Sequence, residues 1–237
     1  MKAKGLVLEG QRFRSPDEVA PPLYLPDVSR FGNDGVFGAG AAAPTWTRLP
    51  SGLWVLTFDG ANTYIDATGA NTPSLDIISS DYTILGWINW LSSGVSQHIL
   101  GRYVLDNNGW EIYLTEWGGD FSLTNRHHHS GTIVDTHPRT AYNSTEWTQG
   151  IWHFMAITRS GNLANHYRNG VDLATTFSTG GLVDPEACTQ DLTIGIRYTK
   201  NAEWYFGMQG LLRVCKYAMS QDQINQHFEA ERRFFGV

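Results

Sequence analysis

The sequence has few cysteines, few charged residues and no long hydrophobic run. Of its 237 residues, 2 are cysteines and 17% are charged, with 17 Lys and Arg against 23 Asp and Glu. Two cysteines exclude a zinc site built from four Cys ligands. The basic residues are scattered, which argues against nucleic acid as a partner. No run approaches the roughly 18 apolar residues of a membrane-spanning helix, so membrane insertion is not expected.

The N-terminal segment lacks the hydrophobic stretch of a secretory signal peptide. Its only apolar run before Glu9 is the short Gly5–Leu8, well below the length that such a signal needs. We therefore expect a protein without a signal peptide that stays in the cytosol before assembly or release. In that reducing compartment, Cys188 and Cys215 are predicted to be buried thiols.

Glycine and aromatic residues are abundant by contrast. The chain has 25 Gly, 9 Trp, 10 Tyr and 11 Phe, a composition typical of many short strands separated by turns. Its length fits one all-β domain of roughly 200–250 residues. The prolines within 16–26 favour extended backbone, so residues 1–26 are predicted to be an extended N-terminal arm. The arm could lie on its own domain or on a neighbouring subunit, and the first is favoured.

Three segments carry clear strand or turn signals. Residues 81–90 have apolar side chains on both faces, which predicts a central strand of a two-layer fold. Residues 54–66 are predicted to form a hairpin around Asp59-Gly60. Asn169-Gly170 is typical of a type I′ turn between two strands.

The C-terminal segment predicts a strand followed by a capped helix. Residues 206–217 alternate as a strand does, and Ser220 with Gln223 has the pattern of a capping box. The helix predicted over 220–233 has a short apolar stripe that includes Ile224 and Phe228. Such a helix would cover a sandwich from outside.

Seven segments, in the same order along the chain, resemble the laminin-G-like, concanavalin A-like lectin domain family. The resemblance rests on Asp27, Ser29, Gly32, Asn33, Asp34 and Gly35, on Phe58-Asp59-Gly60 with Tyr64-Ile65, on 152–158, on 165–171, on 192–195, on Phe206, Gly210, Leu211, Leu212, Val214, Cys215 and Tyr217, and on Met219, Ser220 and Ile224. Leu212 stands where the family has an Asp.

The resemblance implies a fold, a domain plan and a second interpretation of the cysteines. The fold would be all-β, a two-sheet antiparallel jelly-roll sandwich over 27–237 that includes the helix at 220–233. Secreted members carry a disulfide near their end at a spacing similar to that of Cys188 and Cys215. A bond between these two residues therefore stays an alternative to two thiols.

Glycoside hydrolysis is the first catalytic activity to consider, because jelly-roll glucanases share this architecture. A retaining enzyme needs two carboxylates roughly 5–5.5 Å apart, and on a strand these must stand at even spacing to share a face. Glu111 and Glu116 are five positions apart and have no Asp between them at the required place. We therefore expect a protein that is not an enzyme and has no catalytic residues.

Residues 125–147 are predicted to form a long polar insertion that carries His127, His128 and His129. Three adjacent side chains in extended chain point alternately, whereas a metal site needs converging ligands. An exposed polar loop is favoured over a metal site.

Calcium is the metal that the resemblance favours, because family members often bind one near the opening loop. Asn33, Asp34 and Asp59 would supply the oxygen ligands that this cation prefers. Leu212 removes one expected ligand. The alternative is a hydrogen-bonded loop without metal. Calcium is the one cofactor that the resemblance implies.

Two loops have the composition of a sugar-binding surface, an aromatic ring beside groups that form hydrogen bonds. The candidate glycan-binding residues are Trp117, Asp120, Tyr198, Asn201 and Trp204. Both tryptophans could instead lie at the edge of the core.

By analogy with such modules, we expect a non-enzymatic structural or adhesion protein on the surface of a virus or phage particle, as a capsid decoration or tail-fibre component. Its partners would be other protein subunits, reached through the arm and edge strands, with a homo-oligomer as one form. A free carbohydrate-binding lectin, with or without calcium, is the second hypothesis. A degenerate glycan-active enzyme is the third.

Overall fold

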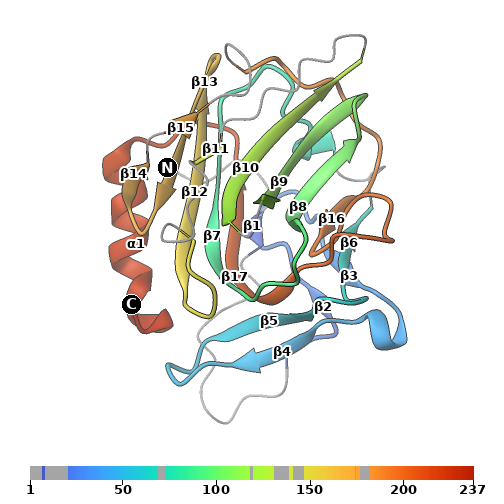
Figure 1. Cartoon of the computed structure of the whole chain (residues 1–237), viewed down its shortest axis with the longest axis vertical. Helices are drawn as coiled ribbons and strands as arrows, with labels where there is room; N and C mark the ends of the chain where they lie inside the picture. Colours follow the sequence, from blue (N-terminus) through green and yellow to red (C-terminus); the bar gives the residue numbers. More distant parts are fainter. Residues whose placement is uncertain are drawn as a thin grey trace.

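The computed structural model describes residues 7–8, 21–68, 73–117, 120–130, 139–140, 147–173, 175–176 and 182–237. Within these residues the chain forms two antiparallel sheets packed face to face, with one α-helix, as the jelly-roll prediction requires (Figure 1). Two short 3-10 helices, η1 (Gly40–Ala42) and η3 (Pro73–Leu75), connect strands.

One sheet has eight described strands. Its order is β14 (Val171–Leu173), β13 (Leu163–Arg168), β12 (His153–Ser160), β7 (Tyr82–Trp90), β17 (Phe206–Cys215), β5 (Trp54–Asp59) and β4 (Thr45–Arg48), and β1 (Val7–Leu8) pairs with β17.

The other sheet has nine described strands. Its order is β15 (Thr175–Thr176), β11 (Arg139–Thr140), β10 (Asp120–His129), β9 (Asn108–Trp117), β8 (Gln97–Val104), β16 (Leu192–Ile194), β6 (Ile65–Ala67), β3 (Gly35–Phe37) and β2 (Tyr24–Leu25).

The main core lies between the two sheets. From β7 it takes Tyr82, Ile84, Ile88 and Trp90, and from β9 it takes alternate residues such as Ile112. The opposite face of β7 presents Leu85 and Trp87 to a second cluster. Apolar residues on both faces of the segment thus reflect a strand at the centre of its sheet, as predicted.

Helix α1 (Gln221–Phe235) covers the outer face of the eight-stranded sheet. The ring of Phe235 stacks on Trp87 with centroids 4.2 Å apart, and Ile224 and Phe228 are buried in the same cluster. Ser220 forms the predicted capping box with Gln223. In Figure 1, α1 lies on the side of the molecule away from β8, β9 and β10, so within the described residues no α-helix covers the outer face of the nine-stranded sheet.

The hairpin predicted over 54–66 is wrong. Strand β5 pairs with β4 and β17 in one sheet, whereas β6 pairs with β3 and β16 in the other. The turn between them is stabilised by Asp59, whose Oδ1 accepts hydrogen bonds from the backbone N–H groups of Ala61, Asn62 and Thr63. Because a side chain satisfies these donors, the chain passes from one sheet to the other without pairing.

The prediction that His127–His129 lie in a polar loop is also wrong. Strand β10 continues through His129, paired with β9 as far as Asn108. The alternating side chains of the strand put His127 beside the core residue Tyr82 and His128 on the outer face beside Glu111. Both histidines are buried. The polar imidazoles led to the prediction of an exposed loop, but hydrogen bonds within the fold allow both side chains to be buried.

Part of the N-terminal arm is included in the sheets. The backbone of Val7–Leu8 pairs with β17 of the same chain, and Tyr24–Leu25 pairs with β3. The side chain of Leu25 is 2% exposed. Residues 1–6 and 9–20 lie outside the described part, so the domain boundary at residue 26 stays a prediction.

Cys188 and Cys215 are both free and buried, as expected for two thiols. Among the described helices, none has the length and apolar character needed to cross a membrane.

Candidate functional site

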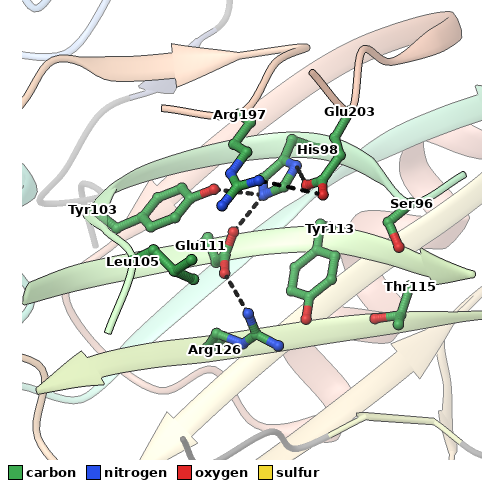
Figure 2. A pocket seen from close by; sticks show the side chains of 10 residues that line it. All are labelled: Ser96, His98, Tyr103, Leu105, Glu111, Tyr113, Thr115, Arg126, Arg197 and Glu203. Atoms are coloured by element: carbon green, nitrogen blue, oxygen red, sulfur yellow. Dashed lines mark hydrogen bonds and ion pairs between the residues drawn. The ribbon is translucent and has the colours of Figure 1, made fainter. Parts of the chain in front are cut away.

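A pocket of about 230 Å³ opens on the outer face of the nine-stranded sheet. Alternation along β9 explains its composition, because Trp110, Ile112 and Leu114 enter the core while Glu111, Tyr113 and Thr115 take the opposite face. Strands β8 and β10 flank β9, and the segment between β16 and β17 forms one rim. We call this cavity the His98 pocket; it is lined by Ser96, His98, Tyr103, Leu105, Glu111, Tyr113, Thr115, Arg126, Arg197 and Glu203 (Figure 2).

His98 lies between two carboxylates. Its Nε2 contacts Oε2 of Glu111, and its Nδ1 is 3.1 Å from Oε2 of Glu203. Burial alone would lower the pKa of His98, but the charges and hydrogen bonds of these two carboxylates raise it above its ordinary value of 6.5. The two carboxylates therefore favour the positively charged imidazolium form of His98.

Glu111 is the most contacted group of the pocket. Besides His98, its carboxylate meets Nε2 of His128 at 3.0 Å and Nη1 of Arg126 at 3.4 Å. Burial alone would raise its pKa, yet His98 and His128 lower it well below the ordinary value. Glu111 is thus a buried anion that is fully compensated from within the fold.

His128 supports Glu111 as a hydrogen-bond donor. The backbone N–H of Asp106 donates to Nδ1 of His128 at 3.1 Å, so this nitrogen accepts and the proton lies on Nε2. That Nε2–H faces Oε1 of Glu111. The backbone N–H of Asp106 therefore fixes the tautomer of His128, which lies at the base of the pocket.

Tyr103 adds a fourth donor to the Glu111 carboxylate, after His98, His128 and Arg126. Its hydroxyl is 2.8 Å from Nε2 of His98, and it shares the Glu111 carboxylate with that ring. Burial first, and then the negative charge of Glu111, raise the pKa of Tyr103 far above the ordinary 10.0. The phenol is therefore a permanent hydrogen-bond donor.

Glu203 is held in an uncommon backbone conformation. Its φ is 57°, in the left-handed region that non-glycine residues rarely adopt and that often marks functional sites. Its carbonyl oxygen accepts a hydrogen bond from the backbone N–H of His98 at 3.1 Å. Both the backbone and the side chain of Glu203 therefore contact His98. Burial would raise the pKa of Glu203, but His98 and Arg197 lower it.

Four rings line up along the base of the pocket. The planes of Tyr113 and His98 differ by 12°, those of His98 and Tyr103 by 9°, and those of Tyr103 and His128 by 11°. The guanidinium of Arg126 lies 5.2 Å above the ring of Tyr113. This packing makes the base rigid, so the pocket exists before any ligand arrives.

The rim is more accessible than the base. Exposure of the side chain is 1% for Glu111 and 3% for His98, but 22% for Arg126, 26% for Arg197 and 31% for Glu203. Chemically, the pocket offers hydroxyl groups, two guanidinium groups and tyrosine edges to a small polar ligand. In the described residues, no group of three or more His, Cys, Asp or Glu side chains is arranged to hold a metal ion.

The structure brings one of the two predicted sugar-binding loops to this pocket. Tyr198 contacts the pocket residue Tyr103, with ring centroids 4.8 Å apart. Trp204 packs near Tyr64, with centroids 6.5 Å apart, and does not line the cavity. Asn201 is exposed and its side chain accepts a hydrogen bond from Thr199.

The other predicted loop lies at the hairpin between β9 and β10. The backbones of Trp117 and Asp120 pair with each other, while their side chains lie outside the described part of the structure. The five glycan-binding assignments stay predictions.

The three predicted calcium ligands lie in well-bonded turns. Asp34 Oδ1 accepts the backbone N–H of Asp27 at 2.7 Å, and Asn33 donates through Nδ2 to Ser74 at 3.1 Å. Asp59 accepts several backbone N–H groups of its own turn, and although its slight burial favours a higher pKa, these bonds lower it. These hydrogen bonds fit the alternative of a loop without metal, and calcium stays a prediction.

Sequence reasoning missed most of the pocket. It considered Glu111 only as half of a catalytic pair with Glu116, and the pocket includes Glu111 but not Glu116. His98, Arg197 and Glu203 escaped notice because the residues converge from four separate segments. The available signal was the run of polar residues at alternate positions in β9, since a strand with one face in the core must show its other face to solvent or to a site.

Comparisons with known proteins agree with the architecture. The sequence profile of the concanavalin A-like lectin/glucanases superfamily matches residues 59–225. Among curated proteins, no relative matches the chain.

Solved structures show the same fold at low sequence identity. Domain 4 of AbnA, an extracellular arabinanase from Geobacillus stearothermophilus solved with arabinotriose, has a TM-score of 0.63 at 15% identity, and the match covers 95% of this chain and 97% of that one. A structure concerned with cell entry of botulinum neurotoxin type C, described as dependent on two ganglioside molecules, has a TM-score of 0.65 at 14% identity over 96% of this chain. The binding domain of Paraclostridial Mosquitocidal Protein 1 has a TM-score of 0.63 at 17% identity, and the match covers 98% of this chain. The chain spans 51% and 55% of these last two proteins, about half their length.

Proposed function

The chain belongs to the concanavalin A-like lectin/glucanases superfamily, and on that premise we propose that it is a non-catalytic carbohydrate-binding module that acts in adhesion. The observation that carries the proposal is the His98 pocket, a polar cavity on the outer face of the nine-stranded sheet, which none of the described α-helical residues cover. The proposed ligand is a terminal sugar unit, because about 230 Å³ is below the roughly 300–1,000 Å³ of pockets for larger ligands.

Binding activities of structurally similar proteins support this choice. The arabinanase domain was solved with arabinotriose, and cell entry of the type C neurotoxin depends on gangliosides. The match covers 97% of the arabinanase domain but only 51% of the neurotoxin chain, so the complex with arabinotriose is the stronger support. For this chain they support a glycan ligand in general and no particular sugar.

The charges in the pocket support binding without catalysis. A glycosidase needs one carboxylic acid with a raised pKa to protonate the leaving group. Glu111 and Glu203 both have lowered pKa values, so both are anions at neutral pH. A degenerate glycan-active enzyme would need another acid, and the pocket residues include none.

The location on a virus or phage particle stays a prediction, as does contact with protein subunits through the arm and edge strands. An adhesion module on a particle would use the same pocket as a free lectin. The two hypotheses therefore differ in whether the protein is attached to a particle or free. They agree that its ligand is a glycan.

The test is a glycan array probed with the purified chain, first in calcium and then in chelator. We expect signal on a limited set of glycans, and Arg126→Ala, which removes a rim side chain, should lose it. Arg232→Ala is the matched control, because Arg232 is exposed on α1 and pairs with Glu229. A blank array for the wild-type chain, or equal signal from the Arg126→Ala chain, would contradict the proposal.

The same array tests the remaining predictions. Signal that disappears in chelator would support a calcium site at Asn33, Asp34 and Asp59, and signal that persists would contradict it. Trp117→Ala and Trp204→Ala chains that keep full signal would contradict the assignment of these two residues.

A further inference from the structure

The His98 pocket has more positive than negative charge. His98, Arg126 and Arg197 face it with positive charge, and Glu111 and Glu203 with negative charge. We infer that the pocket selects a sugar unit that bears a carboxylate, with Arg197 as the residue that receives this group. The inference rests on the proposed function and names the class of its ligand.

The negative charges of the pocket are already compensated on their inner side. Glu111 is bound by His98 and by Nε2 of His128 at 3.0 Å. Glu203 directs Oε2 at the opposite nitrogen of His98, 3.1 Å away. The other carboxylate oxygens lie 3.4 Å from Arg126 and 3.7 Å from Arg197. The two carboxylates are thus shared among three cationic side chains, His98, Arg126 and Arg197, which leaves an excess of positive charge.

Arg197 is placed to bind an anion from outside. Its guanidinium is 3.7 Å from Oε1 of Glu203, longer than the 2.7–2.9 Å of a direct charge-assisted hydrogen bond. The guanidinium also lies 5.7 Å from the ring centre of Tyr198. With a side chain that is 26% exposed and no short hydrogen bond to Glu203, Arg197 is accessible at the rim, and its planar fork matches a carboxylate with two parallel hydrogen bonds.

The rest of the pocket suits the remainder of an acidic sugar. Figure 2 shows Arg197 and Arg126 on opposite sides of Glu111, and Tyr113, Ser96 and Thr115 line the same pocket. A carboxylate at Arg197 would leave the ring of the sugar over Tyr113 and its hydroxyl groups near the side chains of Ser96 and Thr115. A neutral sugar would occupy the same volume but leave the excess positive charge of the pocket uncompensated, a cost that grows as water is displaced.

The experiment compares acidic glycans with their carboxyl-reduced counterparts, which differ only in having a hydroxymethyl group in place of the carboxylate. Glycans ending in uronic acid or in sialic acid are printed beside their reduced forms, and the affinities of the strongest pair are measured by calorimetry. We expect the wild-type chain to bind the acidic form at least about tenfold more tightly, with affinity that falls as salt rises.

Arg197→Gln should remove this preference while retaining weak binding of the reduced form. Arg232→Gln on α1 is the control and should leave the preference unchanged. Equal affinity of the wild-type chain for both forms, or signal only on neutral glycans, would overturn the carboxylate inference and leave the proposed function intact. No signal on any glycan would overturn both, and an Arg197→Gln chain with undiminished preference would overturn the role of Arg197.

Discussion

At the scale of single residues, the site depends on a histidine whose charge is maintained by two carboxylates. His98 is 2% exposed, and burial by itself favours the neutral imidazole. That effect is seen elsewhere in this chain, where burial lowers the pKa of His166 to about 3. The contrast shows that contacts with Glu111 and Glu203, and not burial, decide the charge of His98.

Glu203→Gln should lower the pKa of His98. The substitution keeps the shape of the side chain and removes one of the two negative charges that favour the imidazolium. An NMR titration of the imidazole nitrogens measures the pKa directly. Glu186→Gln is the control, because Glu186 is exposed and approaches His129 instead. An unchanged pKa of His98 in the Glu203→Gln chain would contradict this account.

Acid should destabilise the protein below pH 6.5 through its neutral buried histidines. Burial lowers the pKa of His127 and His166 to about 3, each from 6.5. As the pH falls below 6.5 the unfolded chain binds protons at these positions and the folded chain does not, so the free energy of unfolding falls. Each histidine contributes a slope of about 1.4 kcal/mol per pH unit. The raised pKa of His98 changes the free energy of unfolding only above pH 6.5. The lowered pKa of Glu111 changes it only below pH 4.5.

Urea unfolding between pH 5 and 6.5 tests this prediction. The slope of the free energy of unfolding against pH should be smaller in His166→Gln by about 1.4 kcal/mol per unit. The half-exposed His129 gives the control, since His129→Gln should keep the wild-type slope. Identical slopes for His166→Gln and wild type would show that His166 is not buried in neutral form.

The residues of the pocket were the hardest part to predict from sequence. Alternation correctly separated Glu111 from Glu116, but nothing in the sequence placed His98, Arg197 or Glu203 around that acid. Their convergence depends on the pairing of β8 with β9 and on the left-handed backbone of Glu203. Neither feature leaves a local pattern.

At the scale of elements, helix α1 is fixed by its cap and by a buried ion pair. Glu231 is 8% exposed, lies 2.8 Å from Arg213 and accepts the indole N–H of Trp87 at 2.9 Å. Burial would raise its pKa, but His227, Arg213 and Trp87 lower it. The helix is therefore bonded to the sheet as well as packed on it.

Two substitutions in α1 should differ in cost. Ser220→Ala removes one capping hydrogen bond and should lower the free energy of unfolding by about 1 kcal/mol. Glu231→Ala removes the buried carboxylate that pairs with Arg213 and accepts the Trp87 N–H, and should cost about 3–5 kcal/mol. Gln226→Ala, on the exposed face, should be nearly neutral. Chemical unfolding of the three chains gives the values, and a smaller loss for Glu231→Ala than for Ser220→Ala would contradict this ranking.

Most elements were predictable because their signals are local. The capping box located α1, the apolar pattern on both faces identified β7, and Asn169-Gly170 forms the turn between β13 and β14 with φ values of 50° and 79°. The predictions for 54–66 and for 127–129 were wrong because strand partners are not local. Asp59 closes a turn that leads into another sheet, and His127 enters the core through the alternation of a strand.

At the scale of the whole molecule, the two sheets have different outer faces. The eight-stranded sheet is covered by α1, and the nine-stranded sheet carries the His98 pocket. A sandwich with one face closed in this way directs ligand binding to the other. The family resemblance anticipated this architecture, whereas the choice of face followed only from the structure.

Residues near 25 should behave as part of the sandwich. Leu25 is 2% exposed in the main core, whereas Leu23 is 84% exposed. Leu25→Ala should therefore lower the free energy of unfolding by about 2–5 kcal/mol, and Leu23→Ala by less than about 0.5 kcal/mol. Equal effects in a denaturant titration would show that the segment ending at residue 26 does not pack on the domain in solution.

The central claim is that glycans bind on the outer face of the nine-stranded sheet, at the His98 pocket. The most direct measurement follows the backbone amide signals of the labelled chain by NMR while the strongest glycan from the array is added. We predict that the largest shifts fall in β8, β9, β10 and residues 195–205, and that they disappear in Arg126→Ala but not in Arg232→Ala. Shifts concentrated in α1 and β12–β14, or none anywhere, would contradict the account.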